Sequence, residues 1–81
     1  MKKVLKEERL RALTRQRVIK GYDQEELANL LGISRSHYTK IERGLIDPPT
    51  TLALKIAKLL DSSVEHLFHE LEETLPHKAA V

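Results

Sequence analysis

The stretch QEELANLLGISRSHYTKIER, residues 24–43, decides the fold of this chain. Apolar residues recur at helical spacing on both sides of a glycine: Leu27, Leu30 and Leu31 before it, Tyr38 and Ile41 after it. Asp23 and Ser34 stand immediately before the two runs as N-cap residues, and Glu26 completes a capping-box pattern with Asp23. The pattern predicts two short helices, at about 24–31 and 35–43.

The join between these helices is unusually short. A small residue, Ala28, lets the second helix cross closely over the first, and Gly32 suits a turn that needs a positive φ. Ile33 is expected to plug the corner from inside. A generic helical hairpin has no reason to combine Ala28 with Gly32, so the pattern favours a DNA-binding helix-turn-helix over a purely structural hairpin.

The second helix has a polar face rich in hydrogen-bond donors. With Tyr38 and Ile41 turned inward, the residues predicted to face outward are Arg35, Ser36, Thr39 and Lys40, with His37 on the flank. Arginine can donate two hydrogen bonds to guanine in the major groove, and hydroxyls can meet bases or phosphates. A histidine that is merely solvent-exposed remains the alternative for His37.

Turn signals divide the rest of the chain into further helical segments. Helices are predicted from Lys3 to about Ile19, in the run TTLALKIAKLL (50–60), and from 64 to 75. The first has an imperfect apolar side made by Leu5, Leu10 and Leu13, with Val4 and Val18 as further candidates. The prolines of LIDPP (45–49) form a loop, and Pro76 ends the last helix. We expect an all-α, compact five-helix bundle.

Composition restricts the classes of protein that fit. The chain has 81 residues, three aromatic residues and no cysteine, so it has room for one small aliphatic core without disulfides or a zinc–thiolate site. No signal peptide or membrane span is evident. A soluble, cytoplasmic protein is expected.

Charge is distributed unevenly along the chain. Residues 1–22 hold eight Lys or Arg and two Glu, whereas residues 47–81 hold three cations and six acids. A basic end could meet phosphate and an acidic end could face a partner, although such runs are also common on solvated helix faces. The N-terminal lysines Lys2, Lys3 and Lys6 could hold DNA backbone or add to a dimer contact.

The segments KGYDQEELANLLGISRSHYTKIERG and PPTTLALKIAKLLDSSVEHLF closely resemble the phage-repressor-like helix-turn-helix family of Cro/CI, or XRE, type. The resemblance covers roughly residues 10 to 70 and continues beyond the hairpin. It implies a lambda-repressor-like bundle of five helices that binds palindromic operators as a homodimer. We therefore expect a basic N-terminal extension (1–9), a DNA-binding domain (10–75) with its helix-turn-helix at 24–43, and a flexible tail (76–81).

The resemblance also assigns roles to single residues. Those expected to contact bases are Arg35, Ser36, Thr39 and Lys40. Those expected to contact phosphate are Gln24, Ser34, His37 and Arg43. Arg17 and Glu42 match two family positions that form a partly buried ion pair. This pair joins the first helix to the end of the helix predicted at 35–43.

Four positions depart from the family pattern. Gln16 stands where a small or aliphatic residue is common, Asp23 where threonine or serine is frequent, and Asp61 where glycine is common. Tyr38 replaces an aliphatic residue; a core role is favoured over a hydroxyl directed to phosphate.

Catalysis and metal binding find little support. No glycine-rich phosphate loop, metalloprotease helix or cysteine nucleophile is present. His66 and His69 could ligate a metal, but no third ligand at a fixed position is suggested, so a solvated polar face is favoured. No cofactor and no small-molecule effector are expected.

A single helix of this length contacts only a few base pairs, so specific recognition of a DNA site requires two copies of the protein. The expected dimer surface is the last helix with the end of the preceding one, through Leu67, Leu71 and Leu75, against the alternative that Leu67 packs within the monomer. The sequence thus predicts a dimeric transcriptional regulator, specifically a repressor. The alternatives are an antitoxin or other interaction subunit with autoregulatory DNA binding, and a helical scaffold that never meets DNA.

Overall fold

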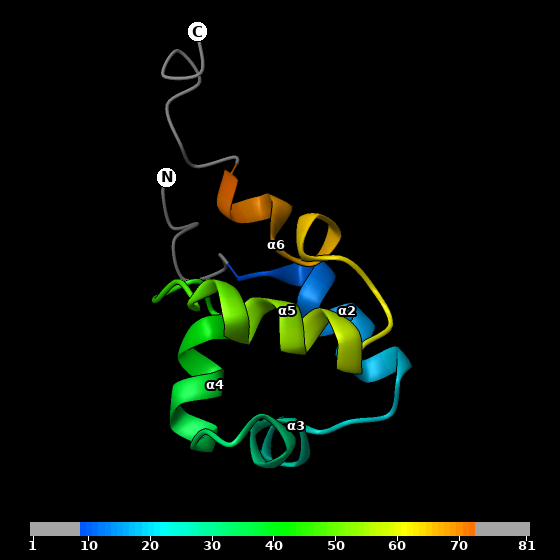
Figure 1. Cartoon of the computed structure of the whole chain (residues 1–81), viewed down its shortest axis with the longest axis vertical. Helices are drawn as coiled ribbons and strands as arrows, with labels where there is room; N and C mark the ends of the chain where they lie inside the picture. The colour runs from blue at the N-terminus through cyan, green and yellow to red at the C-terminus, as the bar shows by residue number, and fades with distance from the viewer. Residues whose placement is uncertain (1–8, 73–81) are drawn as a thin grey trace, which may run out of the picture.

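A computed structural model describes residues 9–72 of the chain (Figure 1). Within this range the chain forms five α-helices: α2 (Arg11–Ile19), α3 (Gln24–Leu31), α4 (Arg35–Glu42), α5 (Thr50–Leu59) and α6 (Val64–Glu72). Residues 9–72 contain no β-strand. The predicted all-α, five-helix fold is confirmed.

The helices pack around a single core. In Figure 1, α3 and α4 form the lower part of the molecule, α5 crosses the middle with α2 behind it, and α6 lies above. The helix pairs in closest contact are α2 with α6, α3 with α4, α5 with α6, α2 with α4, and α3 with α5. The largest fully buried side chains are Leu13, Leu27, Tyr38, Ile41, Ile56, Leu60 and Leu67. Every helix therefore contributes at least one of these side chains, and Leu60, the residue just after α5, adds another.

The turn between α3 and α4 has the predicted form. Asp23 accepts a hydrogen bond from the backbone N–H of Glu26, and the Glu26 side chain accepts one from the N–H of Asp23, which is a complete capping box. Gly32 ends α3 with a φ of 76°, the left-handed region that glycine tolerates. Ala28 is fully buried beneath the crossing, and Ile33 is half-buried against the core.

Residues 9 and 10, predicted to belong to the first helix, are not helical, and α2 begins at Arg11. Leu10 has a ψ of 89°, which is not helical, and its N–H donates to the carbonyl of Glu42 at 2.8 Å. A carboxylate oxygen of Glu70, on α6, then accepts from the N–H of Ala12 in the first turn of α2. Partners distant in sequence thus place the start of α2 at Arg11; the expected residues 3–8 of this helix lie outside the described range.

Two predicted apolar positions face solvent. Val18 is 60% exposed on α2 and Leu30 is 52% exposed on α3. Fewer residues of each helix are therefore buried than the periodicity predicted, because no other helix within residues 9–72 covers these two positions.

Two departures from the family pattern are explained by the corner after α5. Asp61 has a φ of 55°, the conformation that a glycine at this position would adopt without strain. The side-chain amide of Gln16 donates to the carbonyl of Leu60 at 2.8 Å, so it satisfies an acceptor at the end of α5. A polar residue at position 16 therefore ties α2 to this corner.

Within residues 9–72 no helix is long and apolar enough to span a bilayer.

Inside α6, Phe68 departs from helical geometry, with φ −118° and ψ 15°. The predicted continuation through Leu75 to Pro76 lies beyond the described residues.

Candidate nucleic-acid interface

One side of α4 is free to meet another molecule. Arg35, Ser36 and Lys40 are exposed, whereas Tyr38 and Ile41 on the opposite side are fully buried. His37 and Thr39 lie between these extremes and are half-buried. The apolar residues hold the helix to the core, and the three exposed side chains therefore project donors from its outer face.

The beginning of α4 is fixed by its cap. The hydroxyl oxygen of Ser34 accepts a hydrogen bond from the N–H of His37 at 3.0 Å. Ser34 itself is exposed, and its hydroxyl group can both accept this bond and donate one of its own. This geometry presents the first turn of α4, which carries Arg35 and Ser36, at the molecular surface.

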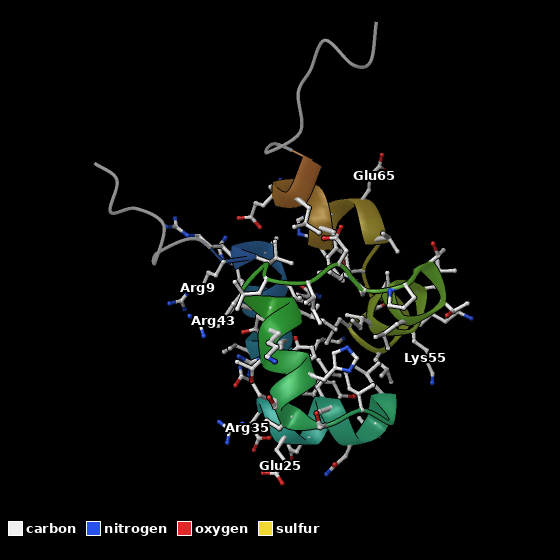
Figure 2. The ribbon with its side chains drawn as sticks, turned by 90° about the vertical axis from the view of Figure 1, so that its left-hand side faces the viewer. Arg9, Glu25, Arg35, Arg43, Lys55 and Glu65 are labelled. Carbon is white, nitrogen blue, oxygen red and sulfur yellow. The ribbon has the colours of Figure 1, made fainter. Side chains whose placement is uncertain are left out.

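Three cations from two segments of the chain share one side of the molecule. Figure 2 shows Arg9, Arg35 and Arg43 projecting from the same side, while Lys55 projects from the opposite side. Arg43 is the C-cap of α4 and is exposed. The surface around α4 is thus positive over a width that exceeds the helix itself, although Glu25 lies next to Arg35 and reduces the local charge (Figure 2).

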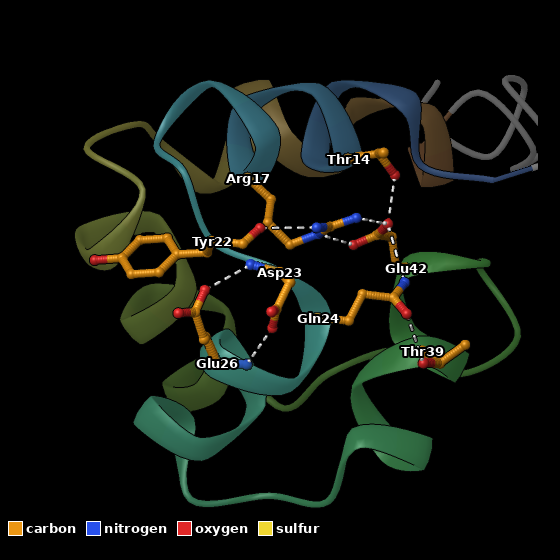
Figure 3. A network of polar contacts seen from close by, with 8 residues as sticks. All are labelled: Thr14, Arg17, Tyr22, Asp23, Gln24, Glu26, Thr39 and Glu42. Atoms are coloured by element: carbon orange, nitrogen blue, oxygen red, sulfur yellow. Dashed lines mark hydrogen bonds and ion pairs between the residues drawn. The ribbon is translucent and has the colours of Figure 1, made fainter.

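A polar network lies directly behind this side (Figure 3). Arg17 on α2 and Glu42 at the end of α4 form a two-pronged ion pair, with Nε to Oε1 at 2.9 Å and Nη2 to Oε2 at 3.0 Å. Their side chains are only 11% and 6% exposed. Arg17 also donates from Nη1 to the carbonyl of Tyr22, and Thr14 donates its hydroxyl to Glu42 at 2.7 Å. The network therefore fixes the end of α4 against α2 and the turn that leads to α3.

The network determines the ionisation of its members. Burial by itself raises the pKa of Glu42, but the hydrogen bonds from Arg17 and Thr14 and the positive charge of Arg17 outweigh it, and the pKa is lowered. The hydrogen bond to Glu42 raises the pKa of Arg17. Both groups are consequently charged at neutral pH.

Gln24, at the start of α3, joins the same network. Its amide Nε2 donates to Oε2 of Glu42 at 3.4 Å, and its Oε1 accepts from the hydroxyl of Thr39 at 3.3 Å. Gln24 also borders a hollow shared with Arg17, Asp23, Glu25 and Arg35. The structure thus brings together Gln24, Thr39 and the ion pair, which sequence spacing alone did not connect.

Tyr38 lies wholly in the core. Its hydroxyl oxygen is buried and has no hydrogen-bond partner of good geometry among the described residues. Burial, and next the negative charge of Glu42, raise the pKa of Tyr38. The possibility that this hydroxyl reaches a phosphate is thereby excluded, and the core role is confirmed.

The sequence of the chain also matches that of known proteins. The helix-turn-helix family pattern matches residues 13–67, more than half of the chain. The chain belongs to this helix-turn-helix family. It is a DNA-binding transcriptional regulator of the XRE, or Cro/CI, type, a family of regulators rather than enzymes.

Individual relatives agree with this assignment. The regulator is 42% identical over 52 residues to the HTH-type transcriptional regulator MJ0272 of Methanocaldococcus jannaschii, a match covering 64% of this chain and 79% of the relative. It is 41% identical over 56 residues to SinR of Bacillus licheniformis, covering 68% of this chain and half of SinR.

A solved structure is similar as well. The crystal structure of the restriction-modification controller protein C.AhdI from Aeromonas hydrophila is 38% identical in sequence, with a TM-score of 0.63. The match covers 72% of the regulator and 84% of C.AhdI. The lambda-repressor-like fold is therefore shared.

The structure corrects one expectation for the dimer surface. Leu67 is fully buried inside the regulator and has no surface to offer a partner, so its assignment to the dimer interface was wrong. Leu71 is half-buried at the edge of the core, and Leu75 lies outside the described residues. The exposed apolar residue of this region is Leu54, on α5, at 51% exposure.

His66 and His69 do not belong to a larger ligand cluster in residues 9–72. Their ring centroids lie 6.2 Å apart, and the described part of the chain contains no group of three His, Cys, Asp or Glu residues able to hold a metal ion.

Sequence reasoning missed three residues that support the site. Thr14 donates to Glu42, Gln16 secures the end of α5, and Glu70 caps α2. The position of Thr14, three residues before Arg17 and so on the same side of one helix, was an available signal. Nothing local indicated the partners of Gln16 and Glu70, which are 44 and 58 residues away.

Proposed function

We propose that the regulator is a repressor that binds a palindromic operator as a homodimer, with α4 in the major groove. The observation that carries the proposal is the exposed outer face of α4, where Arg35, Ser36 and Lys40 present donors while the rest of the helix is anchored in the core. Arg35 and Lys40 are suited to guanine, and the Ser36 hydroxyl to either base or phosphate.

Phosphate contacts are proposed around this face. Gln24 lies at the start of α3, Ser34 is the exposed N-cap of α4, His37 is half-buried on the flank, and Arg43 is exposed at the end of α4. Contacts of this kind set the position of a protein on the duplex but do not read its sequence. A regulator that binds operator DNA needs access to the chromosome, and we therefore propose that it is located in the cytoplasm.

The dimer surface proposed here is the groove between α5 and α6. Its lining is Leu54, Ala57, Lys58, Ser62, Ser63, Val64, Glu65, Phe68 and Leu71. Lys58 and Glu65 have opposite charges, so in a two-fold symmetric dimer Lys58 of each copy could pair with Glu65 of the other. Occlusion of a promoter by such a dimer is the mechanism of repression that we propose.

The first test is selection of duplexes from a random library by the full chain at about 150 mM salt, where nonspecific phosphate binding is weak. We expect an inverted repeat with half-site centres about 34–36 Å apart. Arg35→Ala should relax the base preference at one position, and Gln24→Ala should weaken all duplexes evenly. Failure to enrich any sequence would overturn the proposal.

The dimer is tested separately by sedimentation over a range of protein concentrations. Leu54→Glu should shift the protein to monomer. Leu30→Glu is the matched control, because Leu30 is exposed to almost the same extent on a helix outside the groove. Equal behaviour of the two variants would contradict the proposed surface.

A further inference from the structure

The side-chain amide of Gln24 is held at both ends. Its Oε1 accepts from Thr39 Oγ1 at 3.3 Å, and its Nε2 donates to Oε2 of Glu42 at 3.4 Å (Figure 3). An amide nitrogen carries two hydrogens, so one N–H of Gln24 is left after the bond to Glu42. Gln24 is half-buried, and it borders a surface hollow together with Arg35.

Only one orientation of this amide fits its neighbours. Glu42 is ionised, because Arg17 and Thr14 lower its pKa against the effect of burial, and a carboxylate can only accept. Rotating the Gln24 amide by half a turn would place its carbonyl oxygen against the Glu42 carboxylate. The charge of Glu42 therefore keeps the Nε2 atom of Gln24 directed toward Glu42. The Oε1 atom of Gln24 is then directed toward Thr39, whose hydroxyl donates to it.

The same bond removes Thr39 as a donor to DNA. A threonine hydroxyl has one proton, and Thr39 directs it to Gln24. Thr39 is half-buried, in contrast to the exposed Arg35, Ser36 and Lys40 of the same helix.

We propose that Thr39 is a positioning residue rather than a base-reading one. It orients the Gln24 amide so that the remaining N–H is presented to a DNA phosphate, and so links the placement of α4 to the phosphate contact of α3. This inference rests on the proposed DNA-binding function, and it changes the role expected for Thr39.

The DNA-free protein provides the first test, by NMR of the Gln24 side-chain amide. Thr39→Val keeps the branched shape and removes the donor, whereas Thr39→Ser keeps the hydroxyl. We expect the two Gln24 amide protons to shift and gain mobility in Thr39→Val and to stay near their wild-type positions in Thr39→Ser. An amide unaffected by Thr39→Val would overturn the inference.

The second test is a double-mutant cycle with DNA. Thr39→Val should weaken binding about threefold to tenfold, equally for the selected operator and for a random duplex, as expected for one hydrogen bond. This loss should vanish in a Gln24→Ala background. A changed base preference in Thr39→Val, or an undiminished loss in Gln24→Ala, would show instead that Thr39 reads a base.

Failure of this inference differs from failure of the proposed function. If the wild-type protein enriches no duplex, the proposed function fails, and the NMR result alone decides whether Thr39 orients Gln24. If the wild type binds its operator and the cycle is additive, the proposed function stands and the role of Thr39 is refuted.

Discussion

Between α2, α3 and α4, four hydrogen bonds converge on the carboxylate of Glu42, whereas the groove between α5 and α6 has aliphatic side chains and Phe68 in its lining beside polar ones. Hydrogen bonds depend on direction, so the first region holds its helices at defined positions and angles. Apolar burial depends mainly on area, and the second region leaves Leu54 half-exposed.

The difference matches the function that we propose for each region. A helix that reads base edges must be placed accurately, because a hydrogen bond weakens steeply when its geometry is poor. A surface that pairs with a second copy needs uncovered apolar area. The polar network therefore lies under the proposed DNA-binding side, and the uncovered apolar groove lies away from it.

The largest effect is expected from breaking the ion pair on one side only. Arg17→Met leaves the Glu42 carboxylate buried without its main partner and should lower the free energy of unfolding by about 3–5 kcal/mol. Urea denaturation followed by circular dichroism measures the loss. The double variant Arg17→Met/Glu42→Leu is the control and should recover most of the stability, because no buried charge remains. A loss below about 1 kcal/mol in Arg17→Met would mean that solvent, rather than Arg17, satisfies Glu42.

The apolar region should respond according to burial. Leu67→Ala should cost about 2–5 kcal/mol, because a fully buried leucine leaves a cavity. Leu54→Ala, at an exposed position of α5, should change the stability of the monomer by less than about 0.5 kcal/mol. Urea unfolding at a protein concentration where the chain is monomeric compares the two. Similar losses at both positions would refute the assignment of Leu67 to the core and Leu54 to the surface.

Acid should weaken the polar region selectively. The pKa of Glu42 lies below its ordinary value of 4.5 in the folded protein, so the unfolded chain takes up this proton first. The contribution of Glu42 is thus present above pH 4.5 and is lost as the pH falls through the depressed folded value. In Glu42→Gln the fall of unfolding free energy with acid should be shallower than in the wild type. Parallel acid limbs in the two proteins would show that Glu42 is not preferentially stabilised as a carboxylate.

The smallest effect is expected at the hydroxyl of Tyr38. Because this oxygen is buried without a well-formed hydrogen bond, Tyr38→Phe should be neutral or should stabilise the protein by up to about 1 kcal/mol at neutral pH. Thermal and urea unfolding measure the change. Clear destabilisation would indicate that the hydroxyl donates to Glu42 in solution and belongs to the polar network.

Local features could be predicted from the sequence because their causes lie within a few residues. The capping box of Asp23 and Glu26, the left-handed Gly32 and the Ser34 cap follow from contacts over three or four positions, and they determined α3, α4 and the turn between them. The pairing of Arg17 with Glu42 was expected only because the sequence resembles a family that has it, since spacing alone does not join residues 25 positions apart.

What the sequence by itself determined is therefore the fold class, the helix-turn-helix and the polar face of α4, since periodicity and turn chemistry act locally. Only the tertiary structure decided which parts of each apolar face are covered: Leu67 is buried, while Leu54, Leu30 and Val18 are exposed. It also decided where α2 begins, through Glu42 and Glu70, and that the Thr39 hydroxyl is directed to Gln24. Helical spacing shows which residues share a face, but the neighbouring helix determines what that face touches.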